Sequence, residues 1–450
     1  MNQNSNLDNR AFIAIGLMLF ALFFGAGNLI FPASLGQHAG SNVWWAILGF
    51  IITGVGLPLL GVMAIGYSGA KNVQEMAGRV HPLYGLIYTV LLYLTIGPAF
   101  AIPRTGTVSY EIAVKPFLGG ASAAGVDQTI FLVVFFLVSL WLAINPAKLV
   151  DRIGKVLTPL LLLTIIALII KSLVTPLGGY MAPSQDYATT GIAVVQGFLD
   201  GYNTMDALAS LVFGILVIEF VVLSGAKTKE QITGATFKAG IIAVGCLGFV
   251  YIFIANIGAT SVSAIGLKDT GAPVLAESAM VLFGNLGAII LAVIVLLACL
   301  TTSIGLITSC ATYFHQIIGG LDYKWYAVLF SVVSFFVGMF GLKTIIVAAI
   351  PVLMFLYPLT IVIIALTFLN RVFDGRQCVY AWTMGLTFIT ALMSGFETAE
   401  VSTGALGQFF TAYVPFYGVG MGWVSFAIVG FIMGLIHKAL VTSNEAPAES

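Results

Sequence analysis

The sequence predicts an all-α membrane protein with about twelve transmembrane helices. Its 450 residues are 60% hydrophobic and only 8% charged, whereas a soluble domain carries about 25% charged residues. The apolar residues gather in runs of about 20, the length that spans a bilayer as a helix. Two of these runs are interrupted by glycines and polar residues, which indicates an internal repeat. Because so few charges are available to face water, a soluble fold is excluded.

Each expected span is a mostly apolar stretch between polar or charged residues. We place the spans at residues 11–36, 43–68, 83–112, 128–145, 152–174, 190–220, 235–257, 279–314, 325–342, 345–369, 378–395 and 418–437. Residues 408–417 could instead form a short re-entrant segment. The longest stretches left outside the membrane, near 258–277 and 396–417, are too short for a soluble domain. Any chemistry is therefore expected inside the membrane or at its faces.

The distribution of basic residues indicates which side faces the cytoplasm, because short cytoplasmic loops carry an excess of Lys and Arg. With the N-terminus inside, thirteen of the 18 basic residues are cytoplasmic. The other five lie outside or within the membrane: Arg104, Lys115, Lys171, Lys268 and Lys343. Both termini are therefore expected in the cytoplasm. The polar residues 1–10 precede a full span, so we expect no cleaved signal peptide.

The first span contains the sequence FFGAGNLIFP, from Phe23 to Pro32. Relative to Ala, Gly disfavours a helix by about 1 kcal/mol and Pro by about 3 kcal/mol. In lipid, an interrupted backbone also leaves N–H and C=O groups unpaired, at several kcal/mol each. Such a break is tolerated where freed carbonyls coordinate a cation and a half-helix N-terminus attracts a carboxylate. A close helix crossing at the two glycines is the alternative interpretation.

The sixth span carries a second interruption, GFLDGYNTMD, between apolar flanks at residues 197–206. Transporters built from inverted repeats of five helices have discontinuous helices at corresponding places in the two repeats. We therefore expect a 5+5 inverted repeat with discontinuous helices 1 and 6. Helices 1–5 would occupy residues 1–180, helices 6–10 residues 181–375, and helices 11 and 12 with a cytoplasmic tail residues 376–450. An ordinary loop is the alternative for residues 197–206.

Carboxylates inside the membrane need a role, because a charge near the bilayer centre costs at least about 2.5–3.5 kcal/mol. The expected spans contain four: Glu111, Asp200, Asp206 and Glu219. They could bind a substrate ammonium, ligate a cation or carry a proton. Alternatively, Asp200 and Asp206 cap the two half-helices, and Glu219 pairs with a lysine near the cytoplasmic end.

Arg104, in the sequence AIPRTGTVSYE, is the one basic residue that lies well inside an expected span, away from its ends. We expect it in the outer half of the third span, as a gate residue paired with a carboxylate of the sixth span such as Asp206. A side chain that reaches the interface is the alternative. The eighth span holds consecutive hydroxyls at Thr301, Thr302 and Ser303. They either bond back to the preceding turn or complete a site for a hard cation, which prefers oxygen ligands.

Cysteine and histidine offer no alternative chemistry. The four cysteines have neither metal-ligand nor disulfide spacing. We interpret them as small buried hydrophobic residues. The four histidines lie in loops or at span ends, which argues against a histidine proton relay. We expect no enzyme activity, no cofactor, no binding of nucleic acid and no obligatory protein partner. Lipid is expected to surround the protein.

Three motifs resemble the bacterial branched-chain amino acid carrier family, the Leu/Ile/Val cation symporters. They are FFGAGNLIFPASLG, AIPRTGTVSYE and GFLDGYNTMDALA, and the resemblance covers essentially the whole chain. It implies cation-coupled import of leucine, isoleucine and valine across the bacterial cytoplasmic membrane by alternating access. Sodium is the expected coupling ion. The alternatives are a proton carried by Asp206 or Glu219 and, in a different class, an ion or solute channel.

At longer range the chain resembles the bacterial leucine transporter of the neurotransmitter–sodium symporter family. There, helix 1 carries Gly-x-Gly-Asn shortly before Phe-Pro, and helix 8 carries Leu-Thr-Ser-Ser-Ile. The resemblance implies a sodium site formed by the carbonyls of Ala21, Phe24 and Ala298 and the hydroxyls of Thr301 and Thr302. It further implies Asn28 as a side-chain ligand of a second sodium ion.

The same comparison reveals a departure at the outer gate. The step from Asn28 to Phe31 is one residue shorter than in the distant relatives, and the arginine of their outer gate is missing. We therefore expect Arg104 and a carboxylate of helix 6 to form the gate. The expected substrate site combines both breaks: Gly25, Ala26, Gly27 and Asn28 for the carboxylate, and Asp200, Gly201, Tyr202 and Asn203 for the ammonium.

Overall fold

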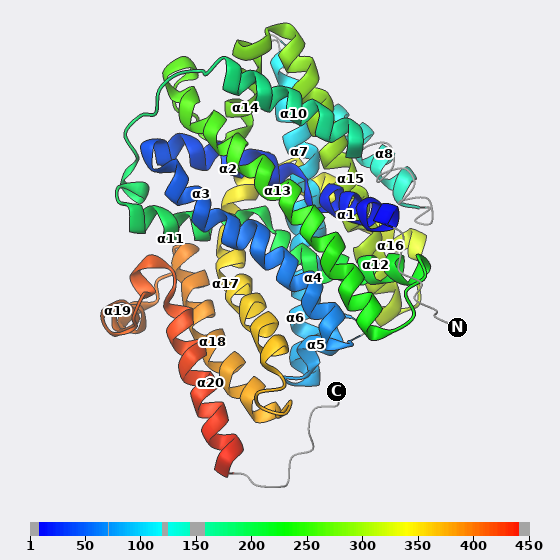
Figure 1. Cartoon of the computed structure of the whole chain (residues 1–450), viewed down its shortest axis with the longest axis vertical. Helices are drawn as coiled ribbons and strands as arrows, with labels where there is room; N and C mark the ends of the chain where they lie inside the picture. The colour runs from blue at the N-terminus through cyan, green and yellow to red at the C-terminus, as the bar shows by residue number, and fades with distance from the viewer. Residues whose placement is uncertain (1–8, 71, 119–124, 145–157, 441–450) are drawn as a thin grey trace.

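The part of the protein that the structure describes is mainly helical. The computed structural model covers residues 9–70, 72–118, 125–144 and 158–440, and these ranges contain no β-strand (Figure 1). The all-α fold predicted from the sequence is confirmed. Large apolar side chains point outward from many helices, among them Trp141 and Leu163, each with 66% of its surface exposed. An apolar exterior of this kind fits a protein surrounded by lipid.

The helices of the first half follow the first five expected spans. Their bounds are α1 Asn9–Phe23, α2 Ala26–Ala39, α3 Val43–Ile51, α4 Leu57–Ser68, α5 Val73–Gly78, α6 Pro82–Leu94, α7 Ala101–Ala113, α8 Val126–Ala143 and α10 Thr158–Val174. A π-helical turn, Ile52–Gly56, joins α3 to α4. Asn72 begins α5 by accepting the backbone N–H of Glu75 at 2.8 Å, which is the usual N-cap bond.

The second half has the same character. Its helices are α11 Thr190–Asp200, α12 Asp206–Leu223, α13 Lys229–Ile265, α14 Gly271–Phe283, α15 Asn285–Ile318, α16 Tyr323–Gly338, α17 Leu342–Leu369, α18 Gln377–Thr398, α19 Gly404–Tyr413 and α20 Gly422–Leu440. A capping box fixes the start of α13. The Thr228 hydroxyl accepts the Gln231 N–H at 3.2 Å, and Gln231 Oε1 accepts the Thr228 N–H at 3.3 Å.

Nine helical stretches in the described part are long and apolar enough to cross a membrane, by length and composition. Four shorter apolar helices accompany them: Phe12–Phe23, Pro159–Val174, Gly271–Phe283 and Tyr323–Gly338. One of the nine, Ala26–Ser68, combines α2, α3 and α4. The protein is therefore a multi-pass membrane protein. The number of twelve spans, the 5+5 repeat and its three residue ranges remain predictions.

The region between the seventh and eighth spans corrects the sequence interpretation. Residues 258–277 are expected outside the membrane, which stays a prediction; within them α13 continues to Ile265 and α14 begins at Gly271. The eighth span was expected from residue 279, whereas residues 279–283 belong to α14 and α15 begins at Asn285. Gly284, with φ of 62°, separates the two helices. A smooth apolar pattern conceals this turn, because a single glycine is enough to make it.

The third span is also interrupted, which the sequence interpretation missed. Between α6 and α7 lies a π-helical turn, Thr95–Ala99, in which Gly97 has non-helical φ and ψ of −91° and −125°. Pro98 follows directly and lacks the N–H that a continuous helix would use. A Cβ atom on Gly97 would lie 2.8 Å from Cys310 Sγ on α15. The turn therefore brings the third span close to α15.

The helices α1 and α2 run through the middle of the molecule, as Figure 1 shows. They pack against α13, α12 and α15. Small residues allow the close approach of α2 and α13. A Cβ atom on Gly36 would lie 2.0 Å from the Ala255 carbonyl oxygen, and one on Gly258 would lie 2.2 Å from the Ala33 carbonyl oxygen. Such glycine crossings are typical of helices that associate in membranes.

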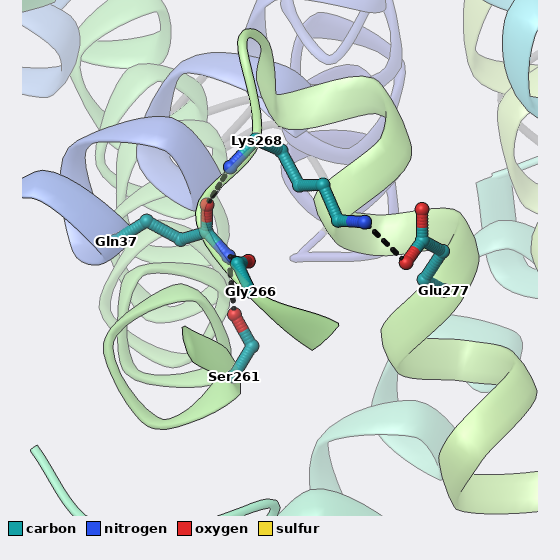
Figure 2. A network of polar contacts seen from close by, with 5 residues as sticks. All are labelled: Gln37, Ser261, Gly266, Lys268 and Glu277. Carbon is teal, nitrogen blue, oxygen red and sulfur yellow. Dashed lines mark hydrogen bonds and ion pairs between the residues drawn. The ribbon is translucent and has the colours of Figure 1, made fainter. Parts of the chain in front are cut away.

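The connection from α13 to α14 is attached to α2 through Gln37 (Figure 2). Gln37 Nε2 donates to Ser261 Oγ at 2.8 Å and to the Gly266 carbonyl at 3.1 Å, and its Oε1 accepts the Lys268 N–H at 2.9 Å. The Lys268 ammonium in turn lies 2.6 Å from a Glu277 carboxylate oxygen. Both ends of the buried Gln37 amide are therefore hydrogen-bonded, and they attach the connection between α13 and α14 to α2.

The last helices form a separate layer beside α17. In Figure 1, α18, α19 and α20 lie together at one side of the molecule, and α18 packs against both α17 and α20. A Cβ atom on Gly434 of α20 would lie 2.7 Å from the Val379 Cα of α18. Residues 408–417 form the end of α19 and an irregular turn, and whether they enter the membrane remains a prediction.

Candidate functional site

The first helix break lies between α1 and α2, as the sequence predicts. Phe24 and Gly25 separate the two helices, and Gly25 has extended backbone angles of −118° and −157°. The Gly25 N–H donates to Asn28 Oδ1 at 2.9 Å. A Cβ atom on Gly25 would lie 2.7 Å from Thr302 Oγ1 on α15. The break is therefore capped by its own chain and depends on a glycine where α15 approaches.

The second break lies between α11 and α12. A 3-10 turn, Gly201–Thr204, leads to Met205, which has a left-handed φ of 64°. Left-handed backbone costs a non-glycine residue energy, and such strain gathers at functional sites. Asp206 then begins α12. The prediction of a discontinuous helix at each of these two places is confirmed.

Arg104 of α7 holds the second break in position. Its Nη1 donates to the Asn203 carbonyl at 2.7 Å, and its Nη2 donates to the Thr204 carbonyl at 3.2 Å. The guanidinium also lies over the ring of Phe31, 5.2 Å from the centroid. Only 3% of Arg104 is exposed. The arginine thus supplies donors to carbonyls that the helix break would leave unpaired.

Asp206 connects both breaks to a third helix. Its Oδ2 accepts Asn28 Nδ2 at 2.5 Å and the Tyr251 hydroxyl of α13 at 2.7 Å. Tyr251 also contacts Asn28 Nδ2. All three side chains are buried. The sequence interpretation missed Tyr251, for which the one available signal was a lone tyrosine in an otherwise apolar span.

No ion pair joins Arg104 to Asp206 within the described part of the chain. The direct gate pair expected from the sequence is therefore not formed in this structure. Thr204 instead links the Arg104 side chain to the Asp206 backbone: its carbonyl accepts from Arg104, and its hydroxyl accepts the Asp206 N–H at 3.3 Å. A gating role for either residue remains a prediction.

The expected sodium ligands come together in part. Thr301 Oγ1 donates to the Ala298 carbonyl at 2.9 Å and lies 3.2 Å from the Ala21 carbonyl. The Thr302 hydroxyl donates to the Leu22 carbonyl at 3.1 Å, a residue that was not among the expected ligands. Phe24 lies at the break itself. Neutral carbonyl and hydroxyl oxygens from α1 and α15 therefore gather here, and such hard donors suit a sodium ion.

The other expected substrate ligands of the second break lie elsewhere. Asp200 accepts from Gln196 Nε2 at 3.0 Å and from the Tyr187 hydroxyl, which places it among residues at the start and end of α11. Tyr202 stacks on Tyr357 of α17, with centroids 4.2 Å apart. Gly201 lies against Thr53, whose hydroxyl would be 1.9 Å from a Cβ atom there. These residues position the break from the side of α3 and α17.

A small cavity lies between the two breaks. Its volume available to a water-sized molecule is about 20 Å³, which is room for about one water and none for a leucine side chain. Residues from both breaks, α7 and α15 line it: Gly25, Ala26, Gly27, Asn28, Ile96, Ala101, Arg104, Thr105, Thr204, Met205, Asp206, Ala209, Phe213, Thr302 and Leu306, with Leu22 and Phe23. Asp200, Gly201, Tyr202 and Asn203 are not among the lining residues.

Comparison with known proteins supports the same interpretation of the chain. A model of the family described as "branched-chain amino acid transport protein" matches residues 8–441. The chain is 48% identical to the branched-chain amino acid permease BraB of Bacillus subtilis over 424 residues, 94% of each protein. It is 46% identical to the permease BrnQ of the same organism, over 96% of this chain and 98% of that protein.

Solved structures share the fold at low identity. MhsT, crystallised with L-phenylalanine, superposes with a TM-score of 0.54 at 18% identity, over 95% of this chain and 98% of that one. Mhp1, a nucleobase-cation-symport-1 family transporter, gives a TM-score of 0.62 at 14% identity, over 95% of this chain and 92% of that one.

The sequence relatives are named as permeases and carriers, not enzymes. The chain therefore belongs to the branched-chain amino acid transport protein family.

Proposed function

We propose that the protein is a secondary active symporter that imports leucine, isoleucine and valine by alternating access. The observation that carries this proposal is the meeting of two broken helices at one buried cavity that also holds an arginine and an aspartate. Broken helices at such a place are characteristic of transporter substrate sites. The relatives named as branched-chain amino acid permeases support the choice of substrate.

The cavity offers both kinds of contact that a branched-chain amino acid needs. The N-terminus of α2, at Ala26 and Gly27, presents unpaired N–H groups to a carboxylate. Ile96, Ala209 and Phe213 offer apolar walls to the side chain. One methylene in such a pocket changes binding by about 1–3 kcal/mol, so leucine, isoleucine and valine should all be accepted. Because the cavity has room for about one water, substrate entry requires the surrounding helices to move apart.

We propose sodium as the coupling ion, at the oxygens shared by α1 and α15. The Thr301 hydroxyl already lies within hydrogen-bond distance of both the Ala21 and the Ala298 carbonyls. Because the site joins two helices, ion binding would favour the arrangement in which these helices lie close together. An ion couples to transport only by binding one conformation better than another.

Proton coupling is the second candidate, and the buried carboxylate of Asp206 favours it. Asp206 accepts hydrogen bonds from Asn28 and Tyr251 inside the membrane, so a change in its charge would alter the contact between both breaks. Glu219, the other carboxylate considered, is exposed near the end of α12. A proton route would therefore pass through Asp206.

The proposed location is the bacterial cytoplasmic membrane, with both termini in the cytoplasm. The excess of Lys and Arg in the loops on that side supports this orientation.

The test is uptake of radiolabelled leucine into liposomes that contain the purified protein. A sodium gradient without a pH gradient should drive accumulation, and valine and isoleucine should compete. Accumulation driven by a pH gradient in sodium-free buffer would instead establish the proton alternative. Preloaded unlabelled leucine should accelerate uptake, because a carrier exchanges its substrate. Lack of this acceleration, with uptake that follows only the leucine gradient, would contradict the carrier mechanism in favour of a channel.

A further inference from the structure

Arg104 and Asp206 both keep hydrogen-bonding capacity that the protein does not use. Two nitrogens of the guanidinium donate to backbone carbonyls, but the buried Nε–H has no acceptor in the described part of the chain. Asp206 accepts hydrogen bonds from Asn28 and Tyr251 on Oδ2, and the Thr204 hydroxyl also lies near its carboxylate. Because a carboxylate can accept about four hydrogen bonds, Asp206 retains acceptor capacity. Both residues line the small cavity between the breaks.

An unused donor on a buried charged group calls for an explanation. Buried polar atoms are almost always hydrogen-bonded, and an unpaired donor on a charged group beside a cavity can be explained by a ligand or water that occupies the cavity. Within the described ranges, neither Arg104 nor Asp206 forms an ion pair. Each charge is thus held in place by neutral partners, and a ligand of opposite charge can still approach it. A zwitterion carries both of the charges that such a site lacks.

The position of Arg104 selects the carboxylate end of the ligand. A Cβ atom on Gly27 would lie 2.8 Å from Arg104 Nη2 and 3.3 Å from the Thr204 Cα. The guanidinium therefore lies against the first turn of α2, where unpaired N–H groups also favour an anion. Gly27 is required for this approach, because any side chain would displace the arginine. Two independent features of the site thus favour a carboxylate at the same place.

The second break offers the ammonium a carboxylate rather than carbonyls. The Asn203 and Thr204 carbonyls, expected to receive the ammonium, already accept from Arg104. The Gly201 carbonyl accepts the Thr204 hydroxyl at 2.9 Å. Asp206 is the carboxylate that lines the cavity. It is therefore better placed than the backbone of the turn to bind a positive charge.

We propose that Arg104 and Asp206 bind the two ends of the zwitterionic head group of the substrate. Arg104, together with the N-terminus of α2, binds the carboxylate, and Asp206 binds the ammonium with its remaining acceptor capacity. This inference rests on the proposed function, because it names the ligands of the amino acid in that site. It makes the α-amino acid head group, and not only the branched side chain, a requirement for binding.

The test compares leucine with two analogues that each lack one charge. Leucinamide keeps the ammonium but has no carboxylate, and 4-methylpentanoate keeps the carboxylate but has no amine. Binding of each to the purified protein in detergent is measured by calorimetry. In Arg104→Gln, leucine affinity should fall about 10- to 100-fold, while leucinamide affinity changes less than threefold. In Asp206→Asn, leucine affinity should fall similarly, whereas 4-methylpentanoate should bind as well as before or better.

Lys438→Gln serves as the control, because it removes one positive charge from an exposed pair with Asp374. It should leave all three affinities unchanged. An equal loss for leucine and leucinamide in Arg104→Gln would overturn the assignment and leave the arginine a structural role. If Arg104→Gln does not fold, Arg104→Lys is measured in its place. The ratio of leucine affinity to leucinamide affinity must then fall at least tenfold from its wild-type value. A wild-type protein that binds no leucine would contradict the proposed function itself.

Discussion

The two helix breaks solve the same problem by different means. At the first, the interruption is two residues long, Gly25 leaves room for Thr302 of α15, and Asn28 of the same segment accepts the Gly25 N–H. At the second, Met205 adopts a left-handed conformation, and Arg104 from α7 satisfies the freed carbonyls. The first break is thus stabilised locally, whereas the second depends on a residue almost 100 positions away.

This difference matters because the breaks touch each other. Asn28 of the first break donates to Asp206 at the start of α12, and Tyr251 donates to the same carboxylate oxygen. A change at one break can therefore reach the other through a single buried contact. Variants that remove the distant support should cost more than variants that affect the local one.

The largest effect is expected for Arg104→Met, which removes the distant support. The Asn203 and Thr204 carbonyls would lose their donors, and each buried unsatisfied group costs about 1–3 kcal/mol. We expect leucine uptake below about a hundredth of the wild-type rate and a lower melting temperature in detergent. Arg104→Lys, which keeps one charged donor, should be intermediate. Uptake within twofold of wild type in Arg104→Met would show that the second break does not need the arginine.

Next in size is Gly25→Ala, which tests the local break. The new Cβ atom would lie 2.7 Å from Thr302 Oγ1, and overpacking of this kind costs about 1–3 kcal/mol. Thermal unfolding and sodium-driven uptake report the loss. The double variant Gly25→Ala with Thr302→Ala should recover part of the lost melting temperature, because the clashing hydroxyl and methyl are gone while the Cβ atom of residue 302 stays 3.1 Å away. It should not recover full sodium dependence if Thr302 binds the ion. A double variant no more stable than Gly25→Ala alone would refute the contact.

A smaller effect is expected for Tyr251→Phe, which acts on the contact between the breaks. Asp206 would keep the Asn28 donor but lose the hydroxyl at 2.7 Å. A lost hydrogen bond to a buried charged group is worth about 1.5–3 kcal/mol, so leucine affinity should fall about tenfold or more. Tyr180→Phe is the matched control, since it removes an exposed tyrosine hydroxyl that donates to Asn256 at 2.7 Å. Equal effects of the two substitutions would argue against a special role for Tyr251.

The smallest effect is expected far from both breaks, at Lys438→Gln. Lys438 pairs with the exposed Asp374 at 2.6 Å near the end of α20. Exposed ion pairs contribute about 0–1 kcal/mol, so uptake and the melting temperature should stay close to wild type. A large loss of transport here would mean that the α18–α20 layer takes part in the transport cycle.

The sequence predicted what depends on short-range chemistry. Glycine at 25 and 27 and the polar GYNT turn disfavour helix in lipid on their own, so both breaks were found. The hydroxyls at Thr301 and Thr302 were likewise visible in an apolar span, and the resemblance to the leucine transporter implied that they lie beside the first span. Such features are visible because the residue types themselves conflict with an apolar span.

The contacts across the fold could not be predicted in the same way. Arg104 was expected to pair with a carboxylate, yet it bonds to backbone carbonyls, which leave no trace in the sequence. Tyr251 resembles any other aromatic residue of a membrane helix until α13 is packed beside Asp206. Asp200 and Tyr202 belong to the same polar motif as Asp206, but Asp200 bonds to Gln196 of its own helix and Tyr202 stacks on Tyr357 of α17. The direction in which each side chain points depends on the backbone of the turn. Met205 in that turn has a left-handed backbone conformation, which is uncommon for a residue other than glycine.

The central claim is that the cavity between the two breaks receives the amino acid side chain. The most direct test is to replace a small residue of the cavity wall with a larger one. Ala209 lies on α12 and lines that cavity. The measurement is the ratio of leucine to valine affinity in Ala209→Val. The account predicts that this ratio falls about tenfold, because the added methyl groups take space that the longer side chain needs. A folded, active variant with the wild-type ratio would contradict the claim that this cavity is the binding site.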